Sequence, residues 1–475
     1  MTNIKLLTSI NKIIILILYL ALILISAFVC SKSSEIYFLS NFSIVSFIIL
    51  IVTFCLFKFY TKTLFSFSSI FILLLYLFHF GQVYLNVIDY SFGKYKMNFI
   101  EYYSINELKS TLIFSFLIIF LTSFGILIKI SFYRKNYEFF SKYRINLSKS
   151  QFKKLAFSFF GLVFPIKFYR DFSLIRYSIN GGYLKTLEAI EEGSGVVTAF
   201  SLIAYTAIIM LILSNYPNKI KMRGLIFLFA GYEIITMLSG GRGIQMVFLL
   251  LLVYIYHNFV EKLNFKGILS ISLIGYILIS FLNIIAVSRN FSSSMLPSLS
   301  TIHSSLITNN PILDLIAELG GTIQTPIEIM RQVPYYLSFG KGNTFIGGIF
   351  RALPNIGGFL NQILEETNFM SKIKASAPGG SYIGELYYNF GYYAYPFAIL
   401  FGVIIEFISK KISNTIVNKN LFEFCLFVPI FILGLWWVRN YFSEIVRVAI
   451  WNAILLLTLN YFINKVFFRK DRSRI

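Results

Sequence analysis

The sequence predicts an all-α polytopic membrane protein with about twelve transmembrane helices and a large, partly helical outer loop. Hydrophobic residues make up 57% of the 475 positions, and long apolar stretches recur from one end to the other. The mean hydropathy is +0.73, which is more apolar surface than a water-soluble fold of this size could bury. We therefore predict a single integral membrane domain over residues 1–475 without a soluble domain.

The apolar stretches predict twelve membrane spans. A span needs roughly 20 mostly apolar residues. The first stretch, Ile13–Val29, is not followed by a small-residue cleavage site and a soluble domain, so we expect it to be a retained helix. The predicted spans are 12–29, 37–57, 64–87, 108–128, 155–169, 196–214, 224–238, 244–258, 267–286, 391–409, 421–437 and 445–464.

The basic residues predict the orientation of these spans. If the first residue is cytoplasmic, 25 of the 42 lysines and arginines fall on the inner side, with only 5 of the 21 acidic residues. The positive-inside rule then predicts that both termini are cytoplasmic. The net charge of +21 thus reflects topology, and we expect no nucleic-acid partner. The densest basic segment, 129–154, is expected to contact anionic membrane lipids.

This orientation leaves two large segments outside the membrane, 170–195 and 287–390. The second is inserted between spans nine and ten, and it retains apolar runs such as PILDLIAEL and FIGGIFRALPNIGGFL. Loops of that length are usually either functional or disordered, and the apolar runs indicate order. We therefore expect residues 287–390 to form a large extracytoplasmic loop with a role in function.

One helix inside the large loop has a recognisable start. In TPIE, Thr325 would be the N-cap, with proline at the first helical position and Glu328 at the third, which is the capping-box pattern. Pro334 would end this helix. Arg331 is then expected near its last turn.

Arginine is common on the predicted outer face, whereas the inner loops carry mostly lysine. A guanidinium group binds phosphate or carboxylate oxygens in pairs, so an outer set of arginines indicates an anion site. The alternative for each arginine is an interfacial position or a salt bridge to a local acid. The set is Arg170, Arg176, Arg242, Arg289, Arg331, Arg351 and Arg439.

Arg242 has the most specific surroundings of these arginines. It lies in the turn TMLSGGRGIQ between two spans, where three glycines allow a tight bend and Gly243 leads into a helix. Helix N-terminal amides favour anions. Glu233 lies about two turns earlier, and we expect it to pair with Arg447 or with Arg242 itself, because an ionisable residue in a membrane is usually paired. A structural pair and a catalytic one both remain open.

Candidates for a general acid or base are few. Glu385 lies at the exit of the large loop and His303 early in it, and further options are Asp314, Glu318 and Glu328. The three cysteines lie in or beside spans and show no metal-type spacing with histidine. Because the sequence also has no acid cluster of a metal-binding kind, we expect neither a metal nor another cofactor.

These features together resemble the Wzy-type polymerases of oligosaccharide repeat units, also called O-antigen polymerases. That family is known for two outer segments that begin with arginine and reach glycine eleven positions later. Here the frames are RDFSLIRYSING, from Arg170 to Gly181, and RQVPYYLSFGKG, from Arg331 to Gly342. The stretches SGGRG and ELYYNFGYYAY are also similar to the family. The resemblance covers nearly the whole chain and implies a GT-C-like bundle in the bacterial cytoplasmic (inner) membrane.

The resemblance implies a metal-independent glycosyltransferase. A glycan on undecaprenyl pyrophosphate would be transferred en bloc, at the outer face, to the terminal sugar of a new lipid-linked repeat unit. Arg242 and Arg331 would stabilise the pyrophosphate charge, and Glu385 or His303 would activate the acceptor hydroxyl. A chain-length regulator protein is an expected partner. Substrate-binding roles are expected for Arg170, Arg176, Arg289, Arg351, Arg439, Gly181 and Gly342.

Two other functions fit the sequence less closely. An O-antigen ligase would share the fold and use a histidine in the large loop, a role that His303 could take. A flippase or transporter of lipid-linked oligosaccharides usually has repeated halves and charged residues along several spans. Here the spans carry few charges and the polar residues concentrate in one outer loop.

Overall fold

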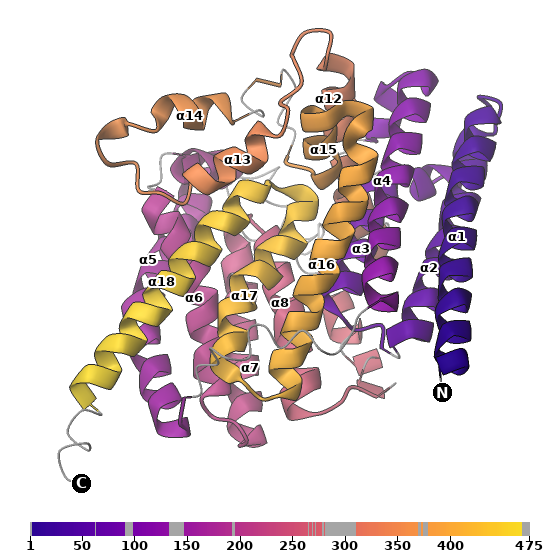
Figure 1. Cartoon of the computed structure of the whole chain (residues 1–475). Coiled ribbons are helices and arrows are strands. Elements are labelled where there is room, and N and C mark those ends of the chain that lie inside the picture. Colours follow the sequence, from indigo (N-terminus) through magenta and orange to yellow (C-terminus); the bar gives the residue numbers. More distant parts are fainter. Residues whose placement is uncertain are drawn as a thin grey trace.

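The computed structural model is a bundle of long helices with a group of short helices at one end (Figure 1). The structure describes residues 2–61, 63–90, 98–132, 147–191, 195–264, short pieces between 266 and 280, 310–368, 372–373 and 379–467. All regular elements within these ranges are helices.

Eleven long helices form the bundle in the described part of the chain. They are α1 (Thr2–Lys32), α2 (Phe38–Thr61), α3 (Phe67–Val87), α4 (Ile105–Ser131), α5 (Lys149–Glu191), α6 (Gly195–Leu213), α7 (Lys219–Thr236), α8 (Gly243–Ile255), α16 (Ala394–Val417), α17 (Leu421–Trp436) and α18 (Phe442–Phe467). The shorter α-helices are α11 (Pro311–Gly320), α12 (Gln324–Gln332), α13 (Asn343–Phe350), α14 (Asn361–Glu366) and α15 (Tyr382–Phe390). Short 3-10 or π segments are η1 (Phe99–Tyr102), η3 (Met237–Ser239), η4 (Tyr256–Val260), η5 (Gly321–Ile323), η6 (Ile356–Gly358), η7 (Gly391–Tyr393) and η8 (Trp437–Arg439).

Ten helical stretches of the described chain are long and apolar enough to cross a membrane. They coincide with ten of the twelve predicted spans, which confirms an all-α polytopic membrane protein. The predicted span 155–169 lies inside α5, a helix of 43 residues that also carries buried charges. The predicted span 267–286 falls partly outside the described residues.

Small residues allow the central helices to pack closely. Gly125 of α4 and Gly402 of α16 face one another, and a Cβ atom on Gly125 would lie 2.0 Å from the carbonyl oxygen of Ile399. A Cβ atom on Gly402 would lie 2.1 Å from the carbonyl oxygen of Thr122. Close backbone approach through small residues is the usual way in which membrane helices associate. This contact holds α16, the first long helix after the predicted large loop, against α4.

Large apolar side chains are exposed on the outside of the bundle. On α1, for example, Ile17, Leu18 and Ile25 are exposed, while Leu16, Tyr19 and Ile23 face the interior. In a bilayer the exposed side chains contact acyl chains, so their exposure has no cost there. The interior contains many contacts between aromatic rings, including the edge-to-face pair of Tyr382 with Trp437.

The short helices α11 to α15 lie at one end of the bundle. Figure 1 shows α12, α13 and α14 at the top, whereas α1 begins and α18 ends at the bottom. α11 packs against α3, and α12 packs against α15 and α4. The described part of the predicted large loop is therefore largely helical and is anchored on the long helices α3 and α4, and through α13 on α18.

The prediction of a loop at 170–195 is wrong for the part that the structure describes. α5 continues without a break to Glu191 and includes the whole RDFSLIRYSING segment. Lys167 lies inside the predicted span 155–169 and Asp171 just beyond its end. Both are buried, and they form an ion pair one turn apart at 2.8 Å. Pairing at this spacing supports a helix rather than ending it.

The predicted capping box at the start of α12 is also wrong. α12 begins at Gln324 directly after η5, so Thr325 lies inside the helix and its hydroxyl donates to the carbonyl of Gly379 at 2.9 Å. The Glu328 carboxylate accepts a hydrogen bond from the Tyr103 hydroxyl instead of capping the helix. The predicted end is confirmed: α12 stops at Gln332, with Arg331 in its last turn.

Candidate functional site

Arg242 and Arg439 line one cavity although 197 positions separate them in the sequence. The cavity has a volume of about 340 Å³ and lies where the turn between α7 and α8 meets the turn between α17 and α18. Glu318 of α11 completes its polar lining. We refer to this site as the arginine cavity.

The SGGRG turn has the shape that the arginine cavity needs because two of its positions require glycine. Gly240 ends η3 with a φ of 101°, in the left-handed region that other residues rarely adopt. A Cβ atom on Gly243 would lie 1.7 Å from the ring of Trp436, so only glycine lets α8 start against that ring. Arg242 is the N-cap of α8 and has no side-chain capping bond, so its guanidinium group is directed to other partners.

The Arg242 guanidinium group forms an ion pair with Glu318. Arg242 Nη1 lies 3.7 Å from Glu318 Oε2, and the Glu318 side chain is 44% exposed. An ion pair this long and this exposed is weak, because solvent screens it. A stronger anion in the cavity would therefore compete for Arg242 and release the Glu318 carboxylate.

The remaining walls of the arginine cavity are largely apolar. Leu74 and Phe78 come from α3, and Val247 and Leu250 come from α8. Two arginines in a largely apolar cavity suit a ligand with an anionic head and a hydrocarbon tail.

The turn that carries Arg439 is held by Glu385. Glu385 Oε2 accepts hydrogen bonds from Trp437 Nε1 at 2.8 Å and from the amide of Phe442 at 3.1 Å, one on each side of Arg439. Glu385 itself is buried and does not line the arginine cavity. The structure therefore connects it to the cavity through the backbone of the 437–442 turn.

Arg351 lies behind this turn in a second cluster of charges. It is half-buried and interacts electrostatically with Glu444, Arg447 and Glu385. Burial, which removes water from the guanidinium group, lowers the pKa of Arg351, and Glu444 opposes that shift. Burial also raises the pKa of Tyr441 to about 12. Arg447 and Glu444 form their own ion pair at 2.6 Å.

Arg331 lies in a different cavity from Arg242. Its Nε is 3.6 Å from Glu107 Oε1 at the start of α4, and both side chains are exposed to solvent. Its frame ends at Gly342, which is the N-cap of α13 with a φ of 88°. The structure thus brings Arg242 and Arg439 together, but it does not add Arg331 to them.

The first arginine-to-glycine frame lies entirely on α5. Arg170 is half-buried and interacts electrostatically with Asp171, while Arg176 is exposed. Gly181 lies farther along the same helix. The predicted residues His303 and Arg289 lie outside the described residues. Their roles stay predictions.

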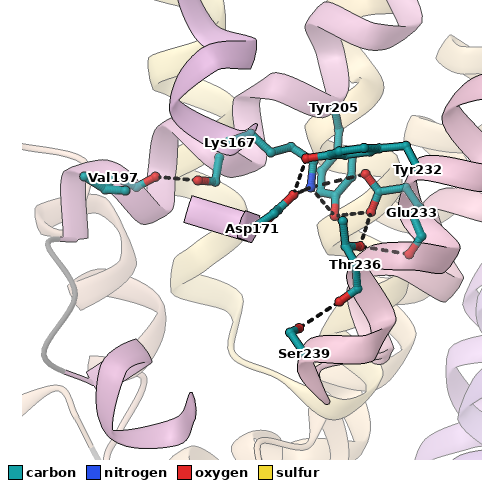
Figure 2. A network of polar contacts seen from close by, with 9 residues as sticks. Lys167, Asp171, Val197, Tyr205, Tyr232, Glu233, Thr236 and Ser239 are labelled. Atoms are coloured by element: carbon teal, nitrogen blue, oxygen red, sulfur yellow. Dashed lines mark hydrogen bonds and ion pairs between the residues drawn. The ribbon is translucent and has the colours of Figure 1, made fainter. Parts of the chain in front are cut away.

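A buried polar network lies between α5, α6 and α7, and its central cation was missed by the sequence analysis. Figure 2 shows Lys167 and Asp171 directed at Glu233 and Tyr232, with Tyr205 between them. Lys167 Nζ is 2.8 Å from Asp171 and 3.2 Å from Glu233, and all three residues are buried. The predicted pairing of Glu233 with Arg447 or Arg242 is therefore wrong.

This network lies next to the SGGRG turn. The Thr236 hydroxyl donates to the carbonyl of Glu233, and Ser239 donates to the carbonyl of Thr236. Ser178 of α5 donates to the carbonyl of Leu238 at 3.2 Å. These bonds attach the start of the turn to α5, so the network supports the backbone that presents Arg242.

Among the described residues there is no group of three histidine, cysteine, aspartate or glutamate side chains that could hold a metal ion. The cationic groups that line the arginine cavity in the described chain are the guanidinium groups of Arg242 and Arg439.

The fold and the site define a multi-pass membrane protein with an arginine-lined cavity between its helices. A family model described as O-antigen polysaccharide polymerase Wzy matches residues 12–471, nearly the whole chain. The chain belongs to this family, whose members are glycosyltransferase-type enzymes that polymerise lipid-linked glycan repeat units in the membrane. No curated protein and no solved structure matches the chain.

Proposed function

We propose that this protein joins undecaprenyl-pyrophosphate-linked repeat units at the outer face of the bacterial cytoplasmic membrane, with the growing glycan transferred en bloc. The arginine cavity is the observation that carries this proposal. Arg242 and Arg439 suit the two phosphates, and the apolar walls suit the first part of a polyprenyl chain. Both termini would then be cytoplasmic, with 287–390 as the extracytoplasmic loop.

The reaction breaks the bond between the anomeric carbon of the growing glycan and its phosphate oxygen. The lipid pyrophosphate leaves with the electron pair, and a hydroxyl of the terminal sugar of the acceptor forms the new bond to the anomeric carbon. Negative charge increases on the phosphate oxygens in the transition state, and two preorganised guanidinium groups stabilise it there. Since these cations supply the stabilisation, the reaction needs no metal.

The proton of the acceptor hydroxyl needs a base. Glu318 is the carboxylate that lines the arginine cavity, and the pyrophosphate would displace it from Arg242. We therefore assign the base role to Glu318, which the sequence analysis held only as a further option. Glu385 becomes a positioning residue for Arg439, because its carboxylate is bonded to Trp437 and Phe442.

Replacement of Arg242 or Arg439 by alanine tests this function. We expect each variant to lower polymer formation by about 10²–10³-fold, the usual loss for one preorganised donor to a developing anion. Arg242→Lys should still lose about tenfold, because a point charge does not replace the paired hydrogen bonds. The measurement is the polymer ladder made by a strain whose own gene copy is deleted.

Arg223→Ala is the matched control for these variants. Arg223 is likewise ion-paired, with Glu261, but it lies in the first turns of α7, at the end of that helix away from the SGGRG turn. It should leave the ladder unchanged at equal protein level. A full ladder from Arg242→Ala and Arg439→Ala would overturn the proposal, and so would transfer of single repeat units to a different acceptor, as a ligase performs it.

A chain-length regulator protein is the partner that we propose for this polymerase. The basis is the family membership alone, and purification of the tagged protein from its own cells would test it.

A further inference from the structure

A second cavity lies beside Arg331, between the start of α4, the end of α12 and the α15–η7 junction. Its volume is about 580 Å³, larger than the arginine cavity. The lining residues that matter here are Asn106, Glu107, Arg331, Tyr335, Tyr387 and Tyr392. We call it the tyrosine cavity.

Aromatic faces are its first notable property. Tyr335 is 81% exposed and Tyr392 is 57% exposed, and both line the cavity. Tyr392 meets Tyr387 and Phe114 edge-to-face, with ring centroids 5.8 Å and 5.9 Å apart, so neighbouring rings support one of its sides. A rigid aromatic ring with a polar hydroxyl can pack against the C–H face of a sugar and bond to its rim.

The polar groups of the cavity are its second notable property. Arg331 and Glu107 form an exposed ion pair at 3.6 Å. They are the charged residues of the described lining, one of each sign, whereas the arginine cavity has two arginines to one carboxylate. A lining without net charge favours a neutral ligand over an anion. The cavity offers planar hydrogen-bonding groups from Arg331, Glu107 and Asn106. Such groups can donate to and accept from neighbouring hydroxyl groups of a ligand. The chemistry points to a neutral, hydroxyl-rich ligand.

The two cavities are connected by a nearly continuous helical segment. α11, η5 and α12 follow one another without a gap from Pro311 to Gln332. Glu318 lines the arginine cavity and Arg331 lines the tyrosine cavity. At about 1.5 Å per helical residue, the thirteen steps between them span up to ~20 Å, the length of a short oligosaccharide.

We propose that the tyrosine cavity is a glycan subsite, which holds sugars of the growing chain while its lipid pyrophosphate is in the arginine cavity. This proposal rests on the proposed polymerase function. A second contact with the chain raises the effective concentration of its reactive end between additions. Loss of the subsite should therefore shorten the polymer rather than prevent the first transfer.

The chain supplies a matched pair of variants for the test. Tyr335→Ala combined with Tyr392→Ala removes the two exposed rings of the cavity. Tyr336→Ala combined with Tyr393→Ala removes their sequence neighbours, which are each 82% exposed but do not line the cavity. Polymer length and the amount of product with one added repeat are both measured in the deletion strain.

We expect the Tyr335 and Tyr392 variant to make shorter polymer with single addition kept, and the control variant to match the unmodified protein. Phenylalanine at both cavity positions should keep most of the length, because the ring faces remain. Binding is measured separately by saturation-transfer NMR on purified protein with lipid-free oligosaccharide released from the strain's own polymer. The alanine variant should bind about tenfold more weakly, since truncated aromatic contacts commonly lose that much.

Unchanged length and unchanged oligosaccharide binding would overturn the subsite. An equal loss in the control variant would also overturn it, because all four tyrosines would then act as an interfacial belt. The polymerase proposal fails on different results, namely full activity of the Arg242→Ala and Arg439→Ala variants. The oligosaccharide binding measurement needs no turnover. It therefore tests the glycan subsite whether or not the polymerase proposal is correct.

Discussion

The arginine cavity and the Lys167 network are two charged sites at neighbouring positions in the bundle, and they are built differently. In the network Lys167 has two carboxylates within 3.2 Å, and all three groups are buried. In the cavity Arg242 has one carboxylate, Glu318, at 3.7 Å, and that carboxylate is 44% exposed. The first site is closed and self-sufficient, whereas the second has room and charge for a ligand.

The difference shows how a membrane protein separates structural charge from functional charge. Charged groups that are buried away from water need partners within the protein. When all of their partners are protein groups, no charge is available to bind a substrate. Tyr232 and Tyr205 donate further hydrogen bonds to Asp171 and Glu233. A loosely paired arginine on a glycine-rich turn is the opposite case, because its best partner is an anion that arrives from outside.

The largest expected effect concerns the carboxylate of the open site. Glu318→Gln should lower polymer formation by about 10²–10⁴-fold, the usual loss for a general base. Glu385→Gln should lose about tenfold, because a glutamine can still accept one of the hydrogen bonds from Trp437 and Phe442. Turnover is measured with purified protein and lipid-linked repeat units. The reverse order of the two losses would make Glu385 the base, as the sequence suggested.

The closed site should respond in stability rather than in turnover. Lys167→Met leaves Asp171 and Glu233 buried without their cation, which typically destabilises a protein by about 3–5 kcal/mol. We expect a lower melting temperature of the purified protein in detergent, and turnover per folded molecule within about threefold of the unmodified protein. The double variant Lys167→Met with Glu233→Gln should recover part of the melting temperature. A stable Lys167→Met protein without turnover would move Lys167 into the catalytic site.

The sequence predicts the helices well because hydropathy and charge act locally. Ten predicted spans are helices, and Arg331 lies in the last turn of its helix as expected. The prediction failed at the end of the span 155–169, because α5 continues through the charged residues there, with Lys167 and Asp171 paired inside the helix. Their spacing of four residues within an apolar helix was the signal that could have revealed a buried pair.

The assembly of the site could be predicted only in part. SGGRG identified Arg242 as the most specific arginine, because the glycines limit the backbone locally. No local sequence pattern connects Arg242 with Arg439 or Glu318. A single sequence does not show which ends of the spans meet in the folded bundle. The same limit explains why Glu385 was a candidate base in the sequence, when its carboxylate accepts hydrogen bonds from Trp437 and Phe442 in the structure.

The smallest expected effect is that of metal removal. If the guanidinium groups of Arg242 and Arg439 stabilise the leaving pyrophosphate, excess EDTA should leave the turnover of the purified enzyme unchanged. Lys167 is no substitute for these arginines, because it is enclosed by Asp171 and Glu233. Loss of activity in EDTA that magnesium or manganese restores would mean that a cation shares the pyrophosphate charge. In that event Arg439→Ala should be partly rescued by raised magnesium, and without such rescue the metal acts elsewhere in the reaction.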